Sequence, residues 1–93
     1  MFAISFDMSI SDLETNYGTP YNRAYFEIKG VLKQNGFEWI QGSTYLTHGD
    51  DLANVIRVII ELSKIEWFRN SVRDIRGYKV ENWSNFTDIV KNP

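Results

Sequence analysis

The chain has 93 residues, a formal net charge of −2, a hydrophobic content of 43% and no cysteine. This length fits a single domain over residues 1–93, and the apolar content is too high for a disordered chain. The acidic balance excludes a protein that coats nucleic acid by bulk positive charge, so such binding would need a local basic patch. The lack of cysteine excludes disulfides, zinc–thiolate sites and cysteine nucleophiles.

No membrane or targeting segment is predicted. No basic leader precedes an apolar run, and the longest apolar cluster, VIRVIIEL, is interrupted by Arg57 and too short to span a bilayer. A chain without cysteine also suits a reducing compartment. We therefore expect a soluble cytoplasmic protein with no membrane partner.

FAISFDM, residues 2–8, predicts the first strand, because apolar residues alternate with small or polar ones. Phe2, Ile4 and Phe6 fall on one face. The other face is small and polar, and its only charge is at Asp7. A carboxylate there is either a solvated strand-end acid or the one acidic group directed at a functional surface.

Two helical segments and a pair of strands are predicted next. Residues 9–18 allow a short turn of helix, and residues 19–36 predict a long helix with apolar positions at helical spacing. Gly30 weakens the middle of that helix, where we expect a neighbouring group to pack closely. Residues 37–47 predict either two strands joined at Gln41–Ser43 or one strand bent by a bulge.

The second half of the chain predicts one more helix and one more strand. Residues 48–65 predict the second long helix, whose core-facing side comprises Leu52, Val55, Ile56, Ile59, Leu62 and Ser63. Residues 72–83 predict the last strand. The segment after it, from Ser84, is predicted to be a short helix or an extended tail.

The element order β-α-β-β-α-β predicts an α+β, ferredoxin-like fold, in which an antiparallel sheet carries both helices on one face. Phe2, Ile4 and Phe6 should then face the helices, and Asp7 should lie on the open face. A second copy often covers such a face. Two Asp7 carboxylates would then share one cleft, which suits acid–base or metal-assisted chemistry.

Two loop residues are candidates for chemistry. Gly42 lets the backbone approach a partner closely, and Ser43 beside it could offer its hydroxyl to a phosphate. Ordinary turn chemistry explains a Gly-Ser pair equally well. His48 is the only histidine, and as a general acid it would need a partner that the sequence does not reveal.

The densest basic stretch is FRNSVRDIRGYK, where aromatic residues stand beside Arg69, Arg73, Arg76 and Lys79. Arginine with aromatic neighbours suits phosphate contact and base stacking. Acidic residues are interleaved with these cations, so the alternative is that they neutralise one another in surface ion pairs.

Several of these stretches together resemble the virulence-associated protein D (VapD) family: FAISFDM, YNRAY, GFEWIQGSTY, and SVRDIRGYKVE followed by W-S-x-F-T. The likeness runs nearly end to end. It implies a bacterial cytoplasmic homodimer with a modified ferredoxin-like fold. It also implies endoribonuclease activity on messenger RNA, in some members as the toxin of a toxin–antitoxin pair.

The resemblance also implies site residues. The family is similar to the small CRISPR-associated ferredoxin-like nuclease subunits, whose acid at the end of the first strand faces its mate across the dimer. Asp7 corresponds to that acid. The Gly-Ser of the family falls on residues 42–43, and its Arg-Asp-x-Arg motif falls on residues 73–76.

The leading hypothesis is therefore a homodimeric, toxin-like endoribonuclease. Asp7 and Ser43 would be the catalytic residues, and Arg73, Arg76 and Lys79 would lie along the RNA phosphates. Asp7 either holds a cation such as Mg²⁺ or takes a proton from the attacking oxygen. The first strand offers no second acid on the parity of Asp7, so a metal site would depend on the dimer mate or on substrate phosphates.

Two other classes of function stay open at this point. One is a nucleic-acid-binding homodimer without catalytic activity, and the other is a module whose sheet face binds a protein partner such as a small antitoxin. The tail from Trp83 either packs on its own subunit or crosses to the dimer mate, because edge strands are ready templates for a second chain.

Overall fold

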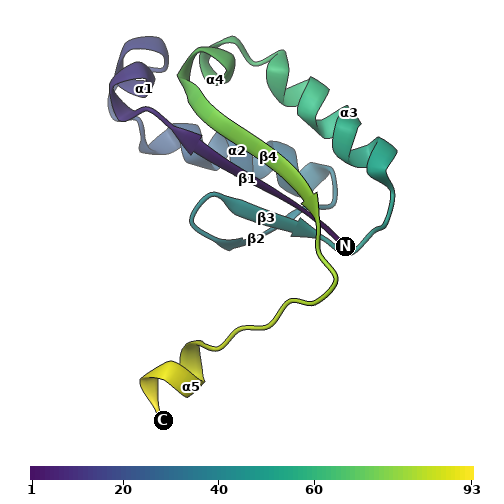
Figure 1. The fold of residues 1–93 in the computed structure, drawn as a ribbon. Coiled ribbons are helices and arrows are strands. Elements are labelled where there is room, and N and C mark those ends of the chain that lie inside the picture. Colours follow the sequence, from purple (N-terminus) through teal and green to yellow (C-terminus); the bar gives the residue numbers. More distant parts are fainter.

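Four strands form one antiparallel sheet in the computed structural model, which describes residues 1–93 (Figure 1). The elements in chain order are β1 (Phe2–Met8), α1 (Ile10–Asn16), α2 (Asn22–Gln34), β2 (Glu38–Gln41), β3 (Thr44–Thr47), α3 (Leu52–Ser63), α4 (Glu66–Ser71), β4 (Val72–Lys79) and α5 (Thr87–Lys91). The strands lie in the order β2-β3-β1-β4, which confirms the predicted ferredoxin-like α+β architecture. No helix is both long enough and apolar enough to cross a lipid bilayer.

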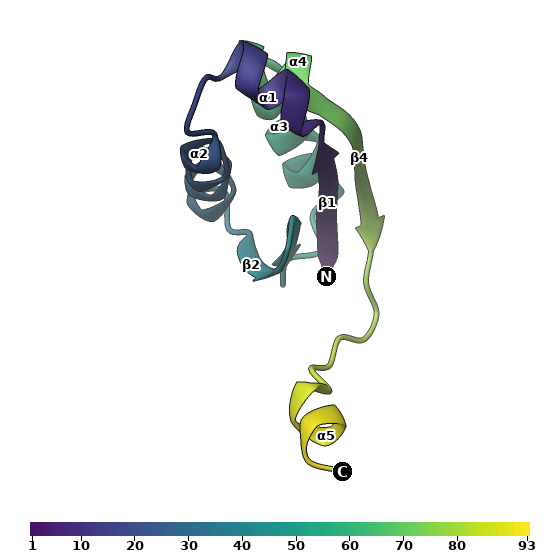
Figure 2. The same ribbon diagram turned by 90° about the vertical axis from the view of Figure 1, so that its left-hand side faces the viewer.

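The predicted division of β1 into two faces is confirmed. Ile4, Phe6 and Met8 are buried in the hydrophobic core, whereas Asp7 is exposed. Figure 2 shows the reason, since α2 and α3 lie on one side of the sheet and leave the other side open. β1 is flanked by β3 and β4, so its open face forms the middle of that uncovered surface.

Helix α2 supplies the core with the apolar stripe expected from its sequence, namely Ala24, Ile28 and Leu32. It begins at Asn22, after a cis bond between Thr19 and Pro20. The expectation of a close neighbour at Gly30 is wrong, because no other atom lies within 4 Å of the position that a Cβ would occupy there. Gly30 is an exposed helical glycine.

The aromatic segment after α2 forms two strands, β2 and β3, so the hairpin alternative is the correct one. Gly42 has φ +50° in the turn, a conformation that glycine adopts without strain. The indole nitrogen of Trp39 donates a hydrogen bond of 2.8 Å to the Gly42 carbonyl and ties the turn to β2.

The predicted second helix, residues 48–65, is α3 (Leu52–Ser63), and a further short helix, α4, follows it where none was predicted. The Asp51 carboxylate accepts a hydrogen bond of 3.0 Å from the Ala53 amide and caps α3. The core-facing side was predicted in part. Val55 and Leu62 are buried as expected, and Ile59 packs partly against the core. Leu52 and Ile56 are instead more than half exposed, and Val58 completes the buried stripe. Apolar residues recur at helical spacing on both sides of this isoleucine- and valine-rich helix, so the pattern did not separate them fully.

The chain leaves the domain after β4, which ends at Lys79 rather than near residue 83. An extended segment leads to α5, and both views show this helix standing apart from the sheet and the other helices (Figures 1 and 2). No residue of α5 is buried. We call residues 80–93 the C-terminal tail.

Candidate functional site on the open sheet face

Strand pairing brings charged and hydroxyl side chains together on the open face. In the antiparallel register Asp7 stands opposite Asp74, and Ser5 stands opposite Arg76. Directly opposite residues share one face of a sheet. On the other side of β1, Ser5 stands opposite Thr44 of β3. The site is therefore built from three adjacent strands.

Two carboxylates and two guanidinium groups form the charged end of this site. Like charges directly opposite one another destabilise a sheet, and Asp7 and Asp74 are such a pair. Arg76 offsets this repulsion by donating from Nε and Nη2 to the two oxygens of Asp74, at 3.0 and 3.4 Å. The Nε of Arg73 lies 3.8 Å from Oδ2 of Asp7. Asp74 is the second acid that the sequence of the first strand did not reveal.

A bulge explains how Arg73 reaches Asp7. Asp7 pairs with Asp74, but the next residue, Met8, pairs with Val72, so Arg73 has no partner in the register. A bulge of this kind redirects the side chain of the extra residue. The carboxylate of Asp7 also acts on Tyr25, whose pKa is raised first by burial, then by Tyr21 and then by Asp7.

A row of hydroxyl groups continues the site across the sheet. Oγ of Ser5 lies 2.7 Å from the hydroxyl of Tyr78 and 3.1 Å from that of Thr44. These bonds link β4, β1 and β3 and fix the direction of the Tyr78 side chain. The row offers donors and acceptors to a sugar or a phosphate. In the sequence, Tyr78 is only one of the aromatic residues of the basic stretch FRNSVRDIRGYK.

Ser43 and Lys79 lie apart from this cluster. The Ser43 carbonyl accepts a hydrogen bond of 3.1 Å from the Phe6 amide, so the turn lies beside the end of β1. The next residue, Thr44, has its hydroxyl on the open face, and the alternation assigns Ser43 to the opposite side. Lys79 stands opposite Phe2, on the side of the sheet that carries the helices.

Comparison with known proteins identifies the relatives of the chain. No protein-family model matches it. It is 59% identical over 91 residues to Endoribonuclease VapD of Dichelobacter nodosus, covering 98% of each chain. It is 58% identical over 84 residues to Endoribonuclease VapD 1 of Riemerella anatipestifer, covering 90% of this chain and 94% of that one. The Helicobacter pylori Endoribonuclease VapD is 50% identical over 94 residues, covering 99% and 100%.

The chain belongs to the VapD family. The resemblance inferred from the sequence motifs is thereby confirmed, since these identities extend over nearly the full length of each protein. The cluster of Asp7, Arg73, Asp74 and Arg76 therefore lies on the framework of a VapD-family domain.

The two other candidates from the sequence have local partners. Nε2 of His48 lies 2.9 Å from a carboxylate oxygen of Glu38, and both side chains are exposed. Nη1 of Arg69 donates to the Ser63 carbonyl at 3.2 Å, which ties α4 to the end of α3. Neither residue extends the charged cluster at the end of β1.

The acid pair offers an incomplete ligand set for a metal ion. No group of 3 or more His, Cys, Asp or Glu side chains is close enough to hold a metal together. Mg²⁺ is commonly bound by one or two carboxylates, with water and substrate phosphates completing the octahedron. Asp7 and Asp74 suit that mode of binding, in which the substrate supplies the remaining ligands.

Proposed function

We propose that this chain is an endoribonuclease that cleaves single-stranded RNA on the open sheet face. The observation that carries the proposal is the exposed Asp7 carboxylate, which lies 3.8 Å from the Arg73 guanidinium and lines the same cleft of the open face as Arg76. Planar guanidinium groups suit phosphate recognition, and a carboxylate beside them can take a proton from the attacking oxygen. The names of the relatives, Endoribonuclease VapD, support this reading.

The reaction needs one proton acceptor and groups that bind the phosphate. Asp7 takes the proton of a 2′-hydroxyl, the freed oxygen forms a bond to the adjacent phosphorus, and the bond from phosphorus to O5′ breaks. The departing O5′ takes a proton from water, which leaves a 2′,3′-cyclic phosphate and a 5′-hydroxyl. Arg73 and Arg76 stabilise the negative charge on the phosphate oxygens. Attack by water would instead leave a 5′-phosphate, so the product ends distinguish the two routes.

The proposed active form is a homodimer in which the Asp7 carboxylates of two copies face one cleft. The open sheet face and the tail support this assembly. Two apolar side chains of α5, Ile89 and Val90, are 66% and 76% exposed. Contiguous exposed apolar surface of this kind marks a binding surface for another macromolecule. A crossing tail would bring the edge strand β4 next to the second copy.

The activity is proposed to be toxin-like and restrained by a small antitoxin protein. If the activity is toxic to the cell that makes the protein, it has to be restrained while that cell grows. Induced expression of the wild-type chain is expected to arrest growth, and Asp7→Asn is expected to permit it. Growth arrest by both would show that the effect does not arise from cleavage at this site.

The catalytic proposal is tested by comparing the wild-type chain with Asp7→Asn on a defined single-stranded RNA, with Mg²⁺ or with chelator. Asp12→Asn is the matched control, because Asp12 is an exposed aspartate of α1, outside the site. Loss of the general base is expected to lower the cleavage rate by roughly 10²- to 10⁴-fold. Asp12→Asn is expected to cut like the wild type.

Other outcomes would redirect the proposal. If Asp7→Asn cleaves the RNA as fast as the wild type and Asp12→Asn do, the activity lies at another site of the chain or in a contaminant. Loss of cleavage with chelator would assign Asp7 to a metal ion rather than to direct proton transfer. If the wild type binds RNA but does not cut it, the catalytically silent binding dimer becomes the better account.

A further inference from the structure

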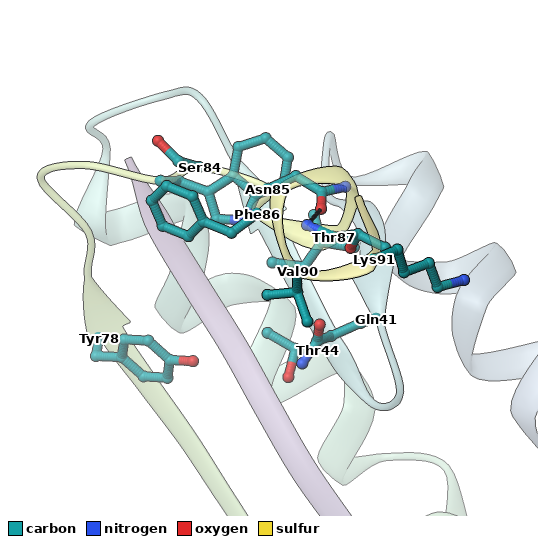
Figure 3. A pocket seen from close by; sticks show the side chains of 11 residues that line it. Gln41, Thr44, Tyr78, Ser84, Asn85, Phe86, Thr87, Val90 and Lys91 are labelled. Carbon is teal, nitrogen blue, oxygen red and sulfur yellow. Dashed lines mark hydrogen bonds between the residues drawn. The ribbon is translucent and has the colours of Figure 1, made fainter. Parts of the chain in front are cut away.

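A cleft of about 790 Å³ lies between the C-terminal tail and the open sheet face. Figure 3 shows Phe86 and Val90 of the tail on one side, and Gln41, Thr44 and Tyr78 of the sheet on the other. Volumes of 300–1,000 Å³ are typical of pockets that hold small organic groups. We call it the tail cleft.

The lining of the tail cleft combines flat apolar surfaces with amide groups. Trp83, Phe86 and Tyr78 all contribute aromatic rings to it, and each is more than 40% exposed. Gln41 makes no side-chain hydrogen bond. Asn85 uses its carbonyl oxygen to accept from the Thr87 amide at 2.9 Å, which leaves its NH₂ group free to donate. Aromatic faces with free amide donors and acceptors match an unpaired nucleobase, which has two apolar faces and a polar edge.

Tyr78 connects the tail cleft with the charged cluster. It also lines the smaller cleft that contains Asp7, Asp74 and Arg76. Its hydroxyl is held by Ser5, so the ring has a fixed direction at the junction of the two clefts. A nucleotide with its base in the tail cleft would therefore direct its sugar and phosphate along β4 toward the two arginines.

We infer that the tail cleft binds one unstacked base of the single-stranded RNA whose phosphate lies at Asp7 and Arg76. This inference rests on the proposed function and names the part of the substrate that the protein recognises, an unstacked base. Recognition of a base requires that the base be unpaired, so the same site disfavours duplex RNA. Ile89 of α5 is 66% exposed and does not line the cleft, so it stays available for contact with a second copy.

The test measures binding separately from cleavage. An RNA oligonucleotide with 2′-O-methyl groups cannot supply the attacking oxygen, and chelator in the buffer prevents attack by a metal-activated water. Its dissociation constant then reports binding alone. Phe86→Ala and Trp83→Ala are each expected to weaken its binding by roughly 5- to 150-fold, the range for loss of one stacked base. Phe26→Ala is the matched control, because Phe26 is 71% exposed on α2 and lines a different cleft. It is expected to bind like the wild type.

Three results would overturn the inference. Phe86→Ala and Trp83→Ala could bind as tightly as the wild type, or Phe26→Ala could lose as much affinity as they do. The third is a change of oligomeric state in Trp83→Ala or Phe86→Ala, seen by light scattering, with unchanged RNA affinity per chain. That result would assign the cleft to a second copy.

The same measurements separate this inference from the proposed function. If the wild-type chain binds RNA through Phe86 but cuts no RNA, the proposed base site is supported and the proposed nuclease activity is refuted. If cleavage depends on Asp7 but RNA affinity is unchanged in Phe86→Ala and Trp83→Ala, the nuclease activity is supported and the base site is refuted. A duplex of the same sequence is expected to bind equally weakly to the wild type and to Phe86→Ala.

Discussion

Arg76 has two possible partners, the carboxylate that holds it and the phosphate that it is proposed to bind. Asp74 orients its guanidinium through two hydrogen bonds, and both side chains are more than half exposed, so this pair contributes little stability by itself. The value of the pair is orientation. A guanidinium already held in one plane loses less freedom when it binds a phosphate.

Replacing Arg76 is expected to change the salt dependence of RNA binding. Each phosphate contact on single-stranded nucleic acid contributes about 0.7 to the slope of log affinity against log salt concentration. Arg76→Ala should therefore lower that slope by about 0.7, whereas Arg76→Lys should retain the slope and lose affinity. Arg57→Ala on α3 is the control, since Arg57 lies on the helical side. An unchanged slope in Arg76→Ala would remove Arg76 from the RNA path.

Ser71 carries the buried side-chain oxygen that has no hydrogen-bond partner. The residue is 0% exposed, and an unsatisfied buried hydroxyl costs on the order of 1–3 kcal/mol. Ser71→Ala removes that group and leaves only a small gap, so we expect it to raise the free energy of unfolding by about 1 kcal/mol. Urea denaturation of both proteins measures the difference. A lower stability would mean that the hydroxyl does find a partner.

At the scale of elements, the predictable parts were those with a strong local period. The two faces of β1 and the buried stripe of α2 follow from residue spacing alone. The existence of α4 does not, because its 6 residues are too few to show a helical period. Nor does the core-facing side of α3, which depends on where the sheet lies.

In the candidate site too, local spacing predicted the position of single residues but not the contacts between strands. Asp7 could be assigned to the open face because parity is a local property. Asp74 could not be recognised as its partner, since they are far apart in sequence and meet only through the register of β1 with β4. The bulge at Arg73 and the position of Lys79 with Phe2 depend on that register too. Pairing between distant strands is information that spacing within one strand does not contain.

Gly30 of α2 offers a test of helix propensity without packing effects. A Cβ there would meet open space, so Gly30→Ala should gain the propensity difference of about 1 kcal/mol. For a domain of this size the midpoint of thermal unfolding should rise by roughly 4–8 °C. Gly36→Ala is the opposite control, because Gly36 has φ +82° and an alanine there is strained. A melting temperature that falls in Gly30→Ala would indicate a contact across the helix in the assembled protein.

For the molecule as a whole, burial of Tyr45 should make the fold sensitive to alkali. Tyr45 is 4% exposed and stacks on Phe6, and burial raises its pKa above the ordinary value of 10.0. A raised folded pKa means that its contribution to stability is complete below about pH 10 and is lost as the pH rises toward the folded pKa. Tyr45→Phe keeps the stacked ring and should lose less stability between pH 9 and about pH 11. Equal losses in both proteins would assign the alkaline effect to other groups.

The C-terminal tail raises the question of whether one chain supplies all the surfaces against which its own elements pack. Five residues are too few for an isolated helix to be stable in water, so α5 needs a surface to pack against. No residue from 81 to 93 is buried. A chain ending at Asn82 should therefore keep its core and unfold at nearly the same temperature as the full-length chain does when that chain is monomeric. If the tail joins two copies, as proposed, light scattering should show the full chain as a dimer and the shortened chain as a monomer.

Ile89→Glu makes the same comparison within the full-length chain. Ile89 lies outside the tail cleft, so a charge there should separate the two copies while leaving the base site intact. Dimers of the shortened chain would place the interface on the sheet face alone. A large fall in the melting temperature of the shortened chain, measured where both proteins are monomers, would instead show that the tail packs on its own domain. Only if the tail joins two copies do the exposed apolar residues of α5 acquire a partner that the single chain does not supply.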